Sequence, residues 1–408
     1  MADQTTTIPK GWKMITLGEV AEKIVDNRGK TPPVIGSGFE LLEVNTISEN
    51  QRTPDYSRVT KFVDEDTFKN WFRTGVILEN DILIPTVGTI GNVSFSKITR
   101  GAIAQNLIAL RTDTKISEPL FIYYLLKNPS SKNKLLNLDI GGVQPSIKVP
   151  HLLAMETAVP PLSEQHAIAA VLSSLDDKIE LLREQNKTLE GTAQAIFKEW
   201  FVNFNFPGAT GKMIDSELGE IPEGWRFGKL GDAIEIFDSK RVPLASDVRA
   251  KRKGKFPYYG ATSIMDYIDD YLFDGTYLLL AEDGSVMDKN GYPVLQYVWD
   301  KFWVSNHSHV LQGKNGFTTE ILYVLLKETN ITGIVNGAVQ LKINQANLVN
   351  FEILVPARDI LGKFDSLIQP IFGKTKNIQQ QIQTLSTLRD ALLPKLMKGE
   401  VRVAGFNN

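Results

Sequence analysis

Apolar residues recur with a heptad rhythm in two long stretches of the chain. The first stretch follows Pro160-Pro161 and the second follows Pro356. Spacings that alternate between four and three residues indicate coiled-coil helices, which we place at 161–204 and 358–400. The first seam comprises Ile168, Leu172, Leu175, Ile179, Leu182, Asn186, Leu189, Ala193, Ile196 and Trp200. The second comprises Ile360, Phe364, Leu367, Ile371, Ile378, Leu385, Leu388 and Leu392.

Three positions qualify this pattern. Ser163 is expected to cap the first helix, with Glu164 in the first turn near the positive end of the helix dipole. Pro370 is expected to kink the second helix or weaken one of its turns, because proline has no backbone N–H. Asn186 lies in the apolar seam, where it either sets the register of helix pairing or occupies a wet or partner-facing place.

Outside the helices the chain repeats itself. Ile8-Pro9-Lys10-Gly11-Trp12 recurs as Ile221-Pro222-Glu223-Gly224-Trp225, at an offset of 213. Gly141-Gly142-Val143-Gln144 recurs as Gly337-Ala338-Val339-Gln340, at an offset of 196. The two offsets differ by 17, so the second copy is shorter by that amount inside its globular part. A period of roughly 200 residues indicates domain duplication, since the repeats of solenoids are far shorter.

Short apolar or alternating runs bounded by Gly, Asp and Asn predict strands in each copy. The clearest runs are 82–85, 103–110, 277–281 and 294–299, and one short helix per copy is expected at 120–127 and 319–327. The fold class is therefore α/β (α+β), with two similar mixed globular domains separated by two long helices.

The order of these parts constrains the helices. If the helices pair with each other, the first runs from one domain to the other and the second runs back, so they are antiparallel and the repeat is pseudo-twofold. A helix of about 40 residues spans roughly 60 Å. The expected parts, in order domain, helix, domain, helix and tail, are 1–160, 161–204, 205–357, 358–400 and 401–408.

Composition is that of a globular protein of two or more domains, with 408 residues, 42% hydrophobic and 23% charged. The chain has no cysteine, which excludes disulfides and thiol chemistry and fits a reducing cytoplasm. No run reaches the ~18 apolar residues of a membrane helix and no apolar stretch follows a basic start, so we expect neither a membrane span nor a signal peptide. The net charge of −2 means that any nucleic-acid contact is local or shared with partners.

Motifs of common active sites are missing. A phosphate-binding loop needs glycine five residues before its Gly-Lys-Thr, but Ile24 and Ile368 stand at those places. His-Glu-x-x-His, Gly-x-Ser-x-Gly and the Asn/Asp-Pro-Pro-Tyr/Phe motif of amino-methyltransferases do not occur either. His307 and His309 form the one close histidine pair, without a third metal ligand nearby. We therefore expect no catalytic residue, no metal and no cofactor.

Positive charge gathers between residues 226 and 260, where nine Lys/Arg face four Asp/Glu, a net of +5. The Gly-punctuated run 249–255 leads into aromatic residues, so its cations can contact phosphates while the rings pack on sugars or bases. The alternative is a solvated surface loop. The candidates for DNA contact here are Lys240, Arg241, Arg249, Lys251, Arg252, Lys253, Lys255 and Tyr258.

The first copy carries a weaker signal of the same kind in Arg28 and Lys30. Gln105-Asn106 and Asn306-His307 occupy similar places in the two copies. Amide and imidazole side chains there either read base edges or satisfy buried turns, and the sequence leaves both possibilities open.

Longer motifs resemble a known family. Pro161-Leu162-Ser163-Glu164-Gln165, Leu172-Ser173-Ser174-Leu175-Asp176-Asp177-Lys178-Ile179 and Phe197-Lys198-Glu199-Trp200-Phe201 are similar to the central conserved region of type I restriction–modification specificity subunits. Leu392-Leu393-Pro394-Lys395-Leu396-Met397-Lys398-Gly399-Glu400 resembles their distal conserved region, and the paired Pro-x-Gly-Trp openings resemble their target-recognition domains. The resemblance covers essentially the whole chain. Pro356-Ala357-Arg358-Asp359 departs from it by lacking the Pro-Leu-x-Glu-Gln start of the first helix.

The resemblance implies a non-catalytic subunit in which each globular domain reads one half of a bipartite site in double-stranded DNA. The helices would set the spacing and dock two methyltransferase subunits, which hold S-adenosylmethionine, and ATP-dependent restriction subunits would join them. Partner contacts would involve Glu164, Gln165, Lys198, Trp200, Phe201, Lys395 and Lys398. The segment missing from the second copy should then lie among the reading loops. The rival functions are an enzyme, which lacks its motifs here, and a coiled-coil scaffold without sequence readout.

Overall fold

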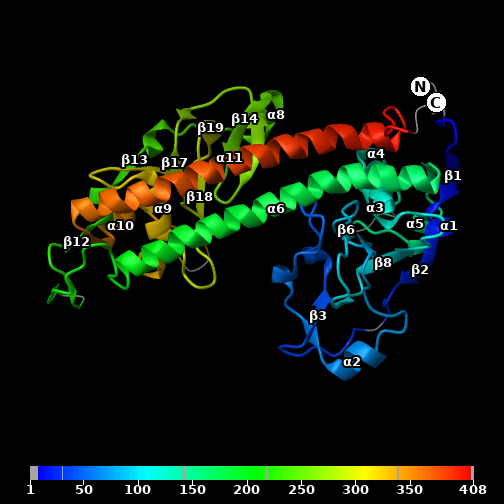
Figure 1. Ribbon diagram of the computed structural model, residues 1–408, viewed down its shortest axis with the longest axis horizontal. Coiled ribbons are helices and arrows are strands. Elements are labelled where there is room, and N and C mark those ends of the chain that lie inside the picture. Colours follow the sequence, from blue (N-terminus) through cyan, green and yellow to red (C-terminus); the bar gives the residue numbers. More distant parts are fainter. Residues whose placement is uncertain are drawn as a thin grey trace. The chain divides into compact units, whose positions relative to one another are not determined.

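The computed structural model describes residues 8–29, 31–139, 141, 144–216, 219–337 and 340–405. The chain forms two compact units: unit 1 holds the described residues of 1–182 and 381–408, and unit 2 those of 183–380. Two long helices, α6 (Leu162–Phe201) and α11 (Arg358–Met397), each contribute one segment to each unit (Figure 1). The fold is mixed helix and strand, as predicted.

Strands among the described residues of unit 1 form a four-stranded sheet, a three-stranded sheet and a separate pair. The four-stranded sheet has the antiparallel order β2-β8-β5-β6, and the three-stranded sheet has the order β4-β3-β7 with β3 and β7 parallel. The strands are β1 (Lys13–Thr16), β2 (Ala21–Val25), β3 (Phe39–Leu42), β4 (Phe62–Val63), β5 (Ile82–Pro85), β6 (Ser94–Phe95), β7 (Ala102–Ile103), β8 (Leu107–Thr112) and β9 (Glu156–Val159), with β1 paired to β9.

Unit 2 repeats this arrangement. Its sheets have the orders β13-β20-β17-β18 and β15-β14-β19-β16, and β12 pairs with β21. As in unit 1, one pair in the second sheet, β14 with β19, is parallel. The strands are β10 (Met213–Ile214), β11 (Ile221–Pro222), β12 (Arg226–Lys229), β13 (Ile234–Ile236), β14 (Lys253–Tyr259), β15 (Ile264–Ile268), β16 (Phe273–Asp274), β17 (Tyr277–Ala281), β18 (Leu295–Val298), β19 (Lys301–Val304), β20 (Ser308–Gly313) and β21 (Glu352–Val355).

Short helices connect the strands. In unit 1 they are α1 (Leu17–Val20), α2 (Glu65–Asn70), α3 (Pro119–Lys127), α4 (Pro129–Asn137), α5 (Val149–Leu153) and the 3₁₀ turns η1 (Val44–Thr46) and η2 (Tyr56–Arg58). In unit 2 they are α7 (Leu230–Ala233), α8 (Ser246–Lys251), α9 (Thr319–Lys327), α10 (Gln345–Asn350) and the turns η3 (Asp238–Lys240) and η4 (Thr332–Ile334).

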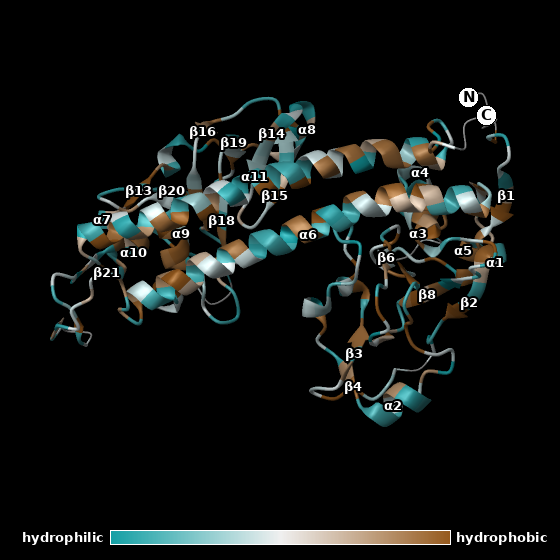
Figure 2. Ribbon diagram, viewed as in Figure 1, coloured by the Kyte–Doolittle hydropathy of each residue, from teal (hydrophilic) through white to brown (hydrophobic). Residues whose placement is uncertain are grey.

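The matched helices α3 and α9 form for local reasons. Glu118 caps α3 by accepting a hydrogen bond from Leu120 N at 3.2 Å, and Pro119 stands at the first helical position. Thr318 caps α9 in the same place. Both helices are apolar, as the brown colour of α3 in Figure 2 shows, and both enter the core of their unit.

The strand registers locate the difference in length between the copies. Ala21 and Ile234 begin equivalent edge strands at an offset of 213. Ile82 and Leu278 occupy equivalent places in the next inner strand at an offset of 196. The shortening of the second copy therefore falls between the first strand of the sheet and β17. This part of unit 2 also carries most of the cations predicted to contact DNA.

Within each unit the segments of α6 and α11 pack antiparallel. In unit 1, Asp176 of α6 pairs with Arg389 of α11 at 2.6 Å, and Glu164 pairs with Arg402, just past the end of α11, at 2.6 Å. In unit 2, the ring of Phe364 lies between 4.8 and 5.9 Å from the rings of three aromatic residues of α6, namely Phe197, Trp200 and Phe201.

Several expectations about elements need correction. The run 103–110 is not one strand, because β7 ends at Ile103 and β8 begins at Leu107 after a turn. Helix α6 begins at Leu162, so Ser163 lies inside its first turn and does not cap it. Helix α11 extends from Arg358 to Met397 through Pro370, and the kink or weakened turn expected there stays a prediction. Across the part of the chain that the structure describes, no helix has the length and apolar character of a membrane span.

Candidate nucleic-acid interface

One turn occupies the same place in both units and carries the side chains predicted to read bases. It joins β7 to β8 in unit 1 and β19 to β20 in unit 2. The N–H groups of Thr86 and Glu282 donate to Asn106 O and His307 O, both at 2.9 Å. Gln105-Asn106 and Asn306-His307 are therefore equivalent, as predicted. The side chains of Asn106, Asn306 and His307 are exposed, so these three do not serve to satisfy a buried interior.

In unit 2 the guanidinium of Arg241 lies behind this turn. Its Nη1 donates to Ser308 O and to Glu282 Oε2, both at 2.7 Å, and to Asn306 O at 3.3 Å. Its Nε donates to Asp238 O at 3.1 Å. The side chain is 13% exposed, so Arg241, predicted to contact DNA, makes its contacts inside the unit.

Asp238 and His309 continue this charged cluster into the interior. His309 Nδ1 donates to Asp238 Oδ2 at 2.6 Å and Nε2 donates to Ile343 O at 2.9 Å. Burial alone would lower the pKa of His309, but the bond to Asp238 and its charge outweigh burial and raise that pKa. Burial would raise the pKa of Asp238, but hydrogen bonds from His309, Val310 N and Gln345 hold it below its usual value.

The ligand atoms of Asp238, Glu282 and His309 lie within 4.8 Å of one another, the spacing of a possible metal site. Both ring nitrogens of His309 face acceptors, so the imidazole keeps both protons and has no lone pair for a metal. Arg241 and Lys342, the latter 3.4 Å from Glu282, supply the remaining positive charge. The cluster is a buried ion network and not a cation site.

The basic segment 249–255 is not a loop. It contains the end of α8 and the start of β14, beside the acidic strand β15. Arg252 pairs with Asp269 at 2.8 Å and Lys253 with Asp266 at 2.5 Å. Arg249 donates to Leu244 O at 2.5 Å. The structure thus neutralises or occupies much of the charge that the sequence assigned to DNA.

Two cations of this segment remain available. Lys251 and Lys255 are exposed, and in the portion of the chain described neither has a carboxylate within ion-pair distance; Lys255 lies 5.2 Å from the ring of Phe256. Lys240 is likewise exposed, 4.9 Å from the ring of Phe237. The remaining DNA candidate, Tyr258, is 1% exposed and its hydroxyl accepts from Leu244 N at 3.0 Å, so it packs inside the unit.

In unit 1, Arg28 binds Asp26 through Nε and Nη2 at 2.8 and 2.6 Å. Lys30 lies outside the described residues. Gln105 donates to Thr31 Oγ1 at 3.0 Å. It lines, together with Asn106, a pocket of about 420 Å³ whose wall also includes Glu43, Asn45 and Lys61.

Sequence reasoning missed a second polar pocket in unit 1. It measures about 600 Å³ and is lined by Arg28, Trp71 and Arg73, among others. The indole of Trp71 is 37% exposed, and Arg73 is exposed without an ion pair among the described residues. Trp71 and Arg73, which follow a short polar helix in the sequence, were the signal from which this pocket could have been predicted. Such a pair suits stacking and phosphate contact.

Two residues expected to bind partners are held inside unit 1. Glu164 is 1% exposed and is bound by Arg402. Gln165, also 1% exposed, accepts from Glu118 N at 3.0 Å and donates to Pro160 O at 3.0 Å. Both side chains anchor the start of α6 to the globular part, so they position this helix and do not present a surface.

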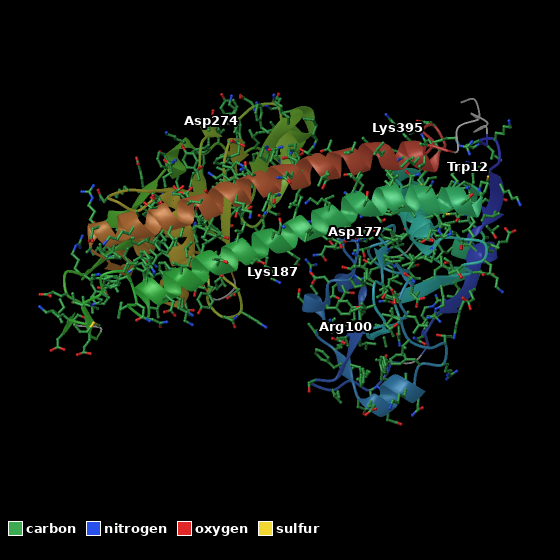
Figure 3. All side chains as sticks on the ribbon, in the orientation of Figure 1. Trp12, Arg100, Asp177, Lys187, Asp274 and Lys395 are labelled. Atoms are coloured by element: carbon green, nitrogen blue, oxygen red, sulfur yellow. The ribbon has the colours of Figure 1, made fainter. Side chains whose placement is uncertain are left out.

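The other expected partner residues divide by exposure. Lys198 in unit 2, and Lys395 and Lys398 in unit 1, are exposed on or just past the long helices (Lys395 in Figure 3). Trp200 and Phe201 belong to the aromatic cluster around Phe364, with Phe201 8% exposed. Their contacts are apolar packing within unit 2, and Trp200 keeps a partly exposed face.

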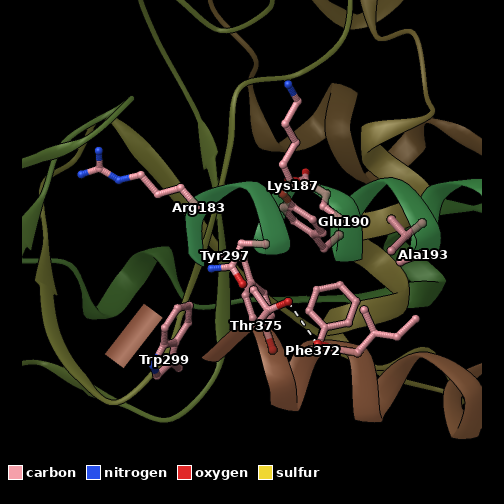
Figure 4. A pocket seen from close by; sticks show the side chains of 12 residues that line it. Arg183, Lys187, Glu190, Ala193, Tyr297, Trp299, Phe372 and Thr375 are labelled. Carbon is pink, nitrogen blue, oxygen red and sulfur yellow. Dashed lines mark hydrogen bonds between the residues drawn. The ribbon is translucent and has the colours of Figure 1, made fainter. Parts of the chain in front are cut away.

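A pocket of about 370 Å³ opens in unit 2 where α6 and α11 meet the sheet (Figure 4). Its lining includes Ala193, Tyr297 and Phe372, and Asn186, whose Oδ1 is buried without a hydrogen-bond partner. At the helix offset of 196, Ala193 and Phe372 correspond to Arg389 and Asp176 of unit 1, which form the buried ion pair there. The place filled by charge in unit 1 is therefore open and aromatic in unit 2, and Asn186 lines this opening.

Comparison with known proteins agrees with this duplicated architecture. A family model described as "Type I restriction modification DNA specificity domain" matches residues 9–191 and again 222–385. The type I restriction enzyme MjaIX specificity subunit of Methanocaldococcus jannaschii is 31% identical, over 97% of this chain and 95% of its own length. The HindI specificity subunit of Haemophilus influenzae is 22% identical, over 85% of this chain and 98% of its own length.

A solved structure has the same fold. The crystal structure of the type I restriction–modification S subunit from M. genitalium superimposes with a TM-score of 0.51, at 18% identity, over 97% of this chain and 98% of that one. Two copies of a target-recognition fold joined by long helices define a class of DNA-specificity proteins. This chain belongs to the type I restriction–modification DNA specificity family.

Proposed function

We propose that this specificity subunit reads a bipartite site in double-stranded DNA, with the globular part of each unit reading one half. The observation that carries the proposal is one turn held by the same backbone bonds in both units but bearing different side chains, Gln105-Asn106 and Asn306-His307. Amide and imidazole groups can pair with base edges in the major groove. Two copies of one scaffold with different side chains would read two different half-sites.

Phosphate contacts would come from cations that the chain does not neutralise itself. Lys240, Lys251 and Lys255 in unit 2 and Arg73 in unit 1 meet this condition among the described residues. The net charge of −2 is compatible with DNA binding if partner subunits supply much of the remaining positive surface.

The long helices would act as a spacer and as a docking surface for two methyltransferase subunits. Exposed Lys198, Lys395 and Lys398 are the candidates for these contacts. In this proposal the chain divides into DNA-reading domains at 1–160 and 205–357, spacer helices at 161–204 and 358–400, and a tail at 401–408.

In this assembly the chain is non-catalytic. The methyltransferase partners would bring S-adenosylmethionine, and restriction subunits would bring ATP-dependent translocation and cleavage, all in the cytoplasm. The sequence supports this division of labour, because it lacks the nucleotide-binding and methyltransferase motifs that either activity requires.

Methylome sequencing tests the proposal against the scaffold alternative. Cells expressing the chain with the methyltransferase of its own system should acquire a split motif methylated on both strands. A matched strain without the chain is the control and should lack that motif. Methylation without any motif, or none beyond the control, would leave a scaffold without sequence readout as the better account.

A further inference from the structure

The turn that carries Asn306 and His307 is held from behind by charged groups. Arg241 donates to the carbonyls on both sides of His307, at Asn306 and Ser308, and also binds Glu282. Glu282 in turn donates its own N–H to His307 O at 2.9 Å. One guanidinium therefore fixes the backbone of the turn at two carbonyls and also binds the Glu282 carboxylate.

A second set of contacts fixes Arg241 itself. Its Nε binds Asp238 O at 3.1 Å and its Nη2 lies 3.4 Å from Asp238 Oδ2. Asp238 is held by Val310 N at 2.9 Å and by Gln345 and His309, both at 2.6 Å. Four side chains of opposite charge, Asp238, Glu282, Arg241 and His309, thus form one buried, mutually neutralised network.

Unit 1 holds the equivalent turn differently. In the matched sheet positions, Thr86 stands for Glu282 and Ile108 for His309. Glu282 and His309 therefore have neutral counterparts in unit 1. The equivalent turn forms there without these two charged groups, which suggests that they serve the particular turn of unit 2.

We propose that Arg241 is a positioning residue that aims Asn306 and His307 at the DNA, and that it makes no phosphate contact. This inference rests on the proposed function of the turn as a reader of base edges. Hydrogen bonds to bases need side chains placed to within a fraction of an ångström, so a turn free to shift would lose discrimination. Arginine suits the role because its planar fork binds the turn and Glu282 through Nη1 while Nε binds Asp238 O, which the single nitrogen of a lysine does not allow.

The test measures base preference and salt dependence separately. The full chain, assembled with the methyltransferase subunits of its own system, is used to select double-stranded DNA from a library randomised in both half-sites. For Arg241→Gln we expect preference at one or two positions of a single half-site to fall by roughly 5-fold or more. The slope of log affinity against log salt should stay unchanged, whereas a lost phosphate contact would reduce it by about 0.9.

Two further variants of the network and one control variant complete the test. Arg241→Lys keeps the charge and should still lose preference at the same positions, because one ammonium nitrogen cannot bind both the turn and Asp238 O. Glu282→Gln is nearly isosteric and should shift preference at those positions in the same direction but by less. Lys251→Gln is the matched control and should lower the salt slope while leaving base preference intact.

The outcomes are separable. The half-site read by unit 1 reports in every variant whether the assembly remains intact, and near-ultraviolet circular dichroism reports the tertiary packing of the variant. A folded Arg241→Gln chain that keeps its base preference, with or without a reduced salt slope, overturns the inference. A wild-type chain that selects no split motif overturns the proposed function instead.

Discussion

At the scale of single residues, burial distinguishes cations that bind groups of the protein itself from cations that remain free to contact a ligand. Arg241 and Arg249 each have 13% of their side chain exposed and donate to carbonyls of their own unit. Lys251 and Lys255 lie in the same basic segment but are exposed. A cation already bound inside the protein gains little from a phosphate, so the two lysines are the better candidates for DNA contact.

The double variant Lys251→Gln/Lys255→Gln is expected to weaken DNA binding for all sequences alike. Each phosphate contact releases counterions, so losing two should reduce the salt slope by roughly 1.8. Fluorescence anisotropy at several salt concentrations measures this slope. Lys363→Gln, the same change of charge on α11, is the control. A selective loss of preference at one half-site would show instead that the lysines read bases.

The stability of unit 2 is expected to depend on pH through His309. Its folded pKa is raised above the ordinary 6.5, so its contribution to stability is fully present below pH 6.5 and is lost as pH rises through the folded pKa. The charged groups that face it are Asp238 and Glu282, themselves paired with Arg241 and Lys342. Asp238 acts in the opposite sense, because its depressed pKa removes stability as pH falls below 3.8.

Thermal melts of the full chain across pH 5 to 9 check this expectation. His309→Gln should lose the alkaline decline of the unit 2 transition, since a glutamine does not titrate. The control is His151→Gln, which changes an exposed histidine of unit 1 and should keep the alkaline decline of the unit 2 transition. Identical pH profiles for wild type and His309→Gln would show that the network contributes no titrating charge.

At the scale of elements, the two ends of the helix pair are fastened by different chemistry. Unit 1 uses buried ion pairs: Asp176 binds Arg389, and the buried Arg52 reaches from the globular part to Glu180 and Asp177 of α6 (Asp177 in Figure 3). Unit 2 has Phe372 and Ala193 at the corresponding places, and the ring of Phe372 packs on Tyr297 and Tyr323 at 5.0 and 5.8 Å. Breaking a buried ion pair leaves an uncompensated charge, so single changes should be more costly in unit 1.

Arg389→Met is expected to lower the free energy of unfolding of unit 1 by about 3–5 kcal/mol, because the Asp176 carboxylate stays buried without its cation. Chemical denaturation of the full chain measures it. Asp390→Asn removes the exposed carboxylate that pairs with the same arginine and should cost at most about 1 kcal/mol. A double variant, Arg389→Met with Asp176→Leu, should recover most of the loss. Equal losses of stability in Arg389→Met and Asp390→Asn would contradict the argument.

The elements that sequence alone predicted well are those with local causes. Helices α3 and α9 have their caps and apolar faces within a dozen residues, and the heptad seams mark α6 and α11 directly. The prediction that the basic segment 249–255 is a loop was wrong, because β14 forms by pairing with strands farther along the chain, notably β19. Glu164 was assigned to a partner surface because Arg402, which binds it, lies 238 residues away.

The same reason limits prediction of the candidate site. The equivalence of Gln105-Asn106 and Asn306-His307 follows from the repeat and was found from sequence. The contacts of Arg241 could not be predicted from sequence, because its acceptors belong to residues 238, 282, 306 and 308, which are spread along the chain. Charge counting along the sequence cannot show which cations fold inward.

At the scale of the whole molecule, the proposed function predicts that the distance between half-sites depends on the length of the two helices. The helices share the offset of 196 at both ends, so a change in one has a defined counterpart in the other. Deleting residues 182–188 with their counterparts 378–384 removes one heptad from each helix and preserves the seam. At ~1.5 Å per residue this is roughly 10 Å, or about three base pairs of DNA at ~3.4 Å each.

The deletion variant should therefore methylate the same two half-sites with a spacer shortened by about three base pairs. The change in length also rotates the half-sites by about a third of a DNA turn, so a rigid spacer would lose activity on the original site altogether. Methylome sequencing of the deletion strain measures both effects. The control replaces residues 182–188 with the sequence of residues 378–384. This change keeps the length of the helix and its apolar seam, so the DNA spacer should stay unchanged. An unchanged gap in the deletion strain would mean that the partners, and not the helices of this chain, set the spacing.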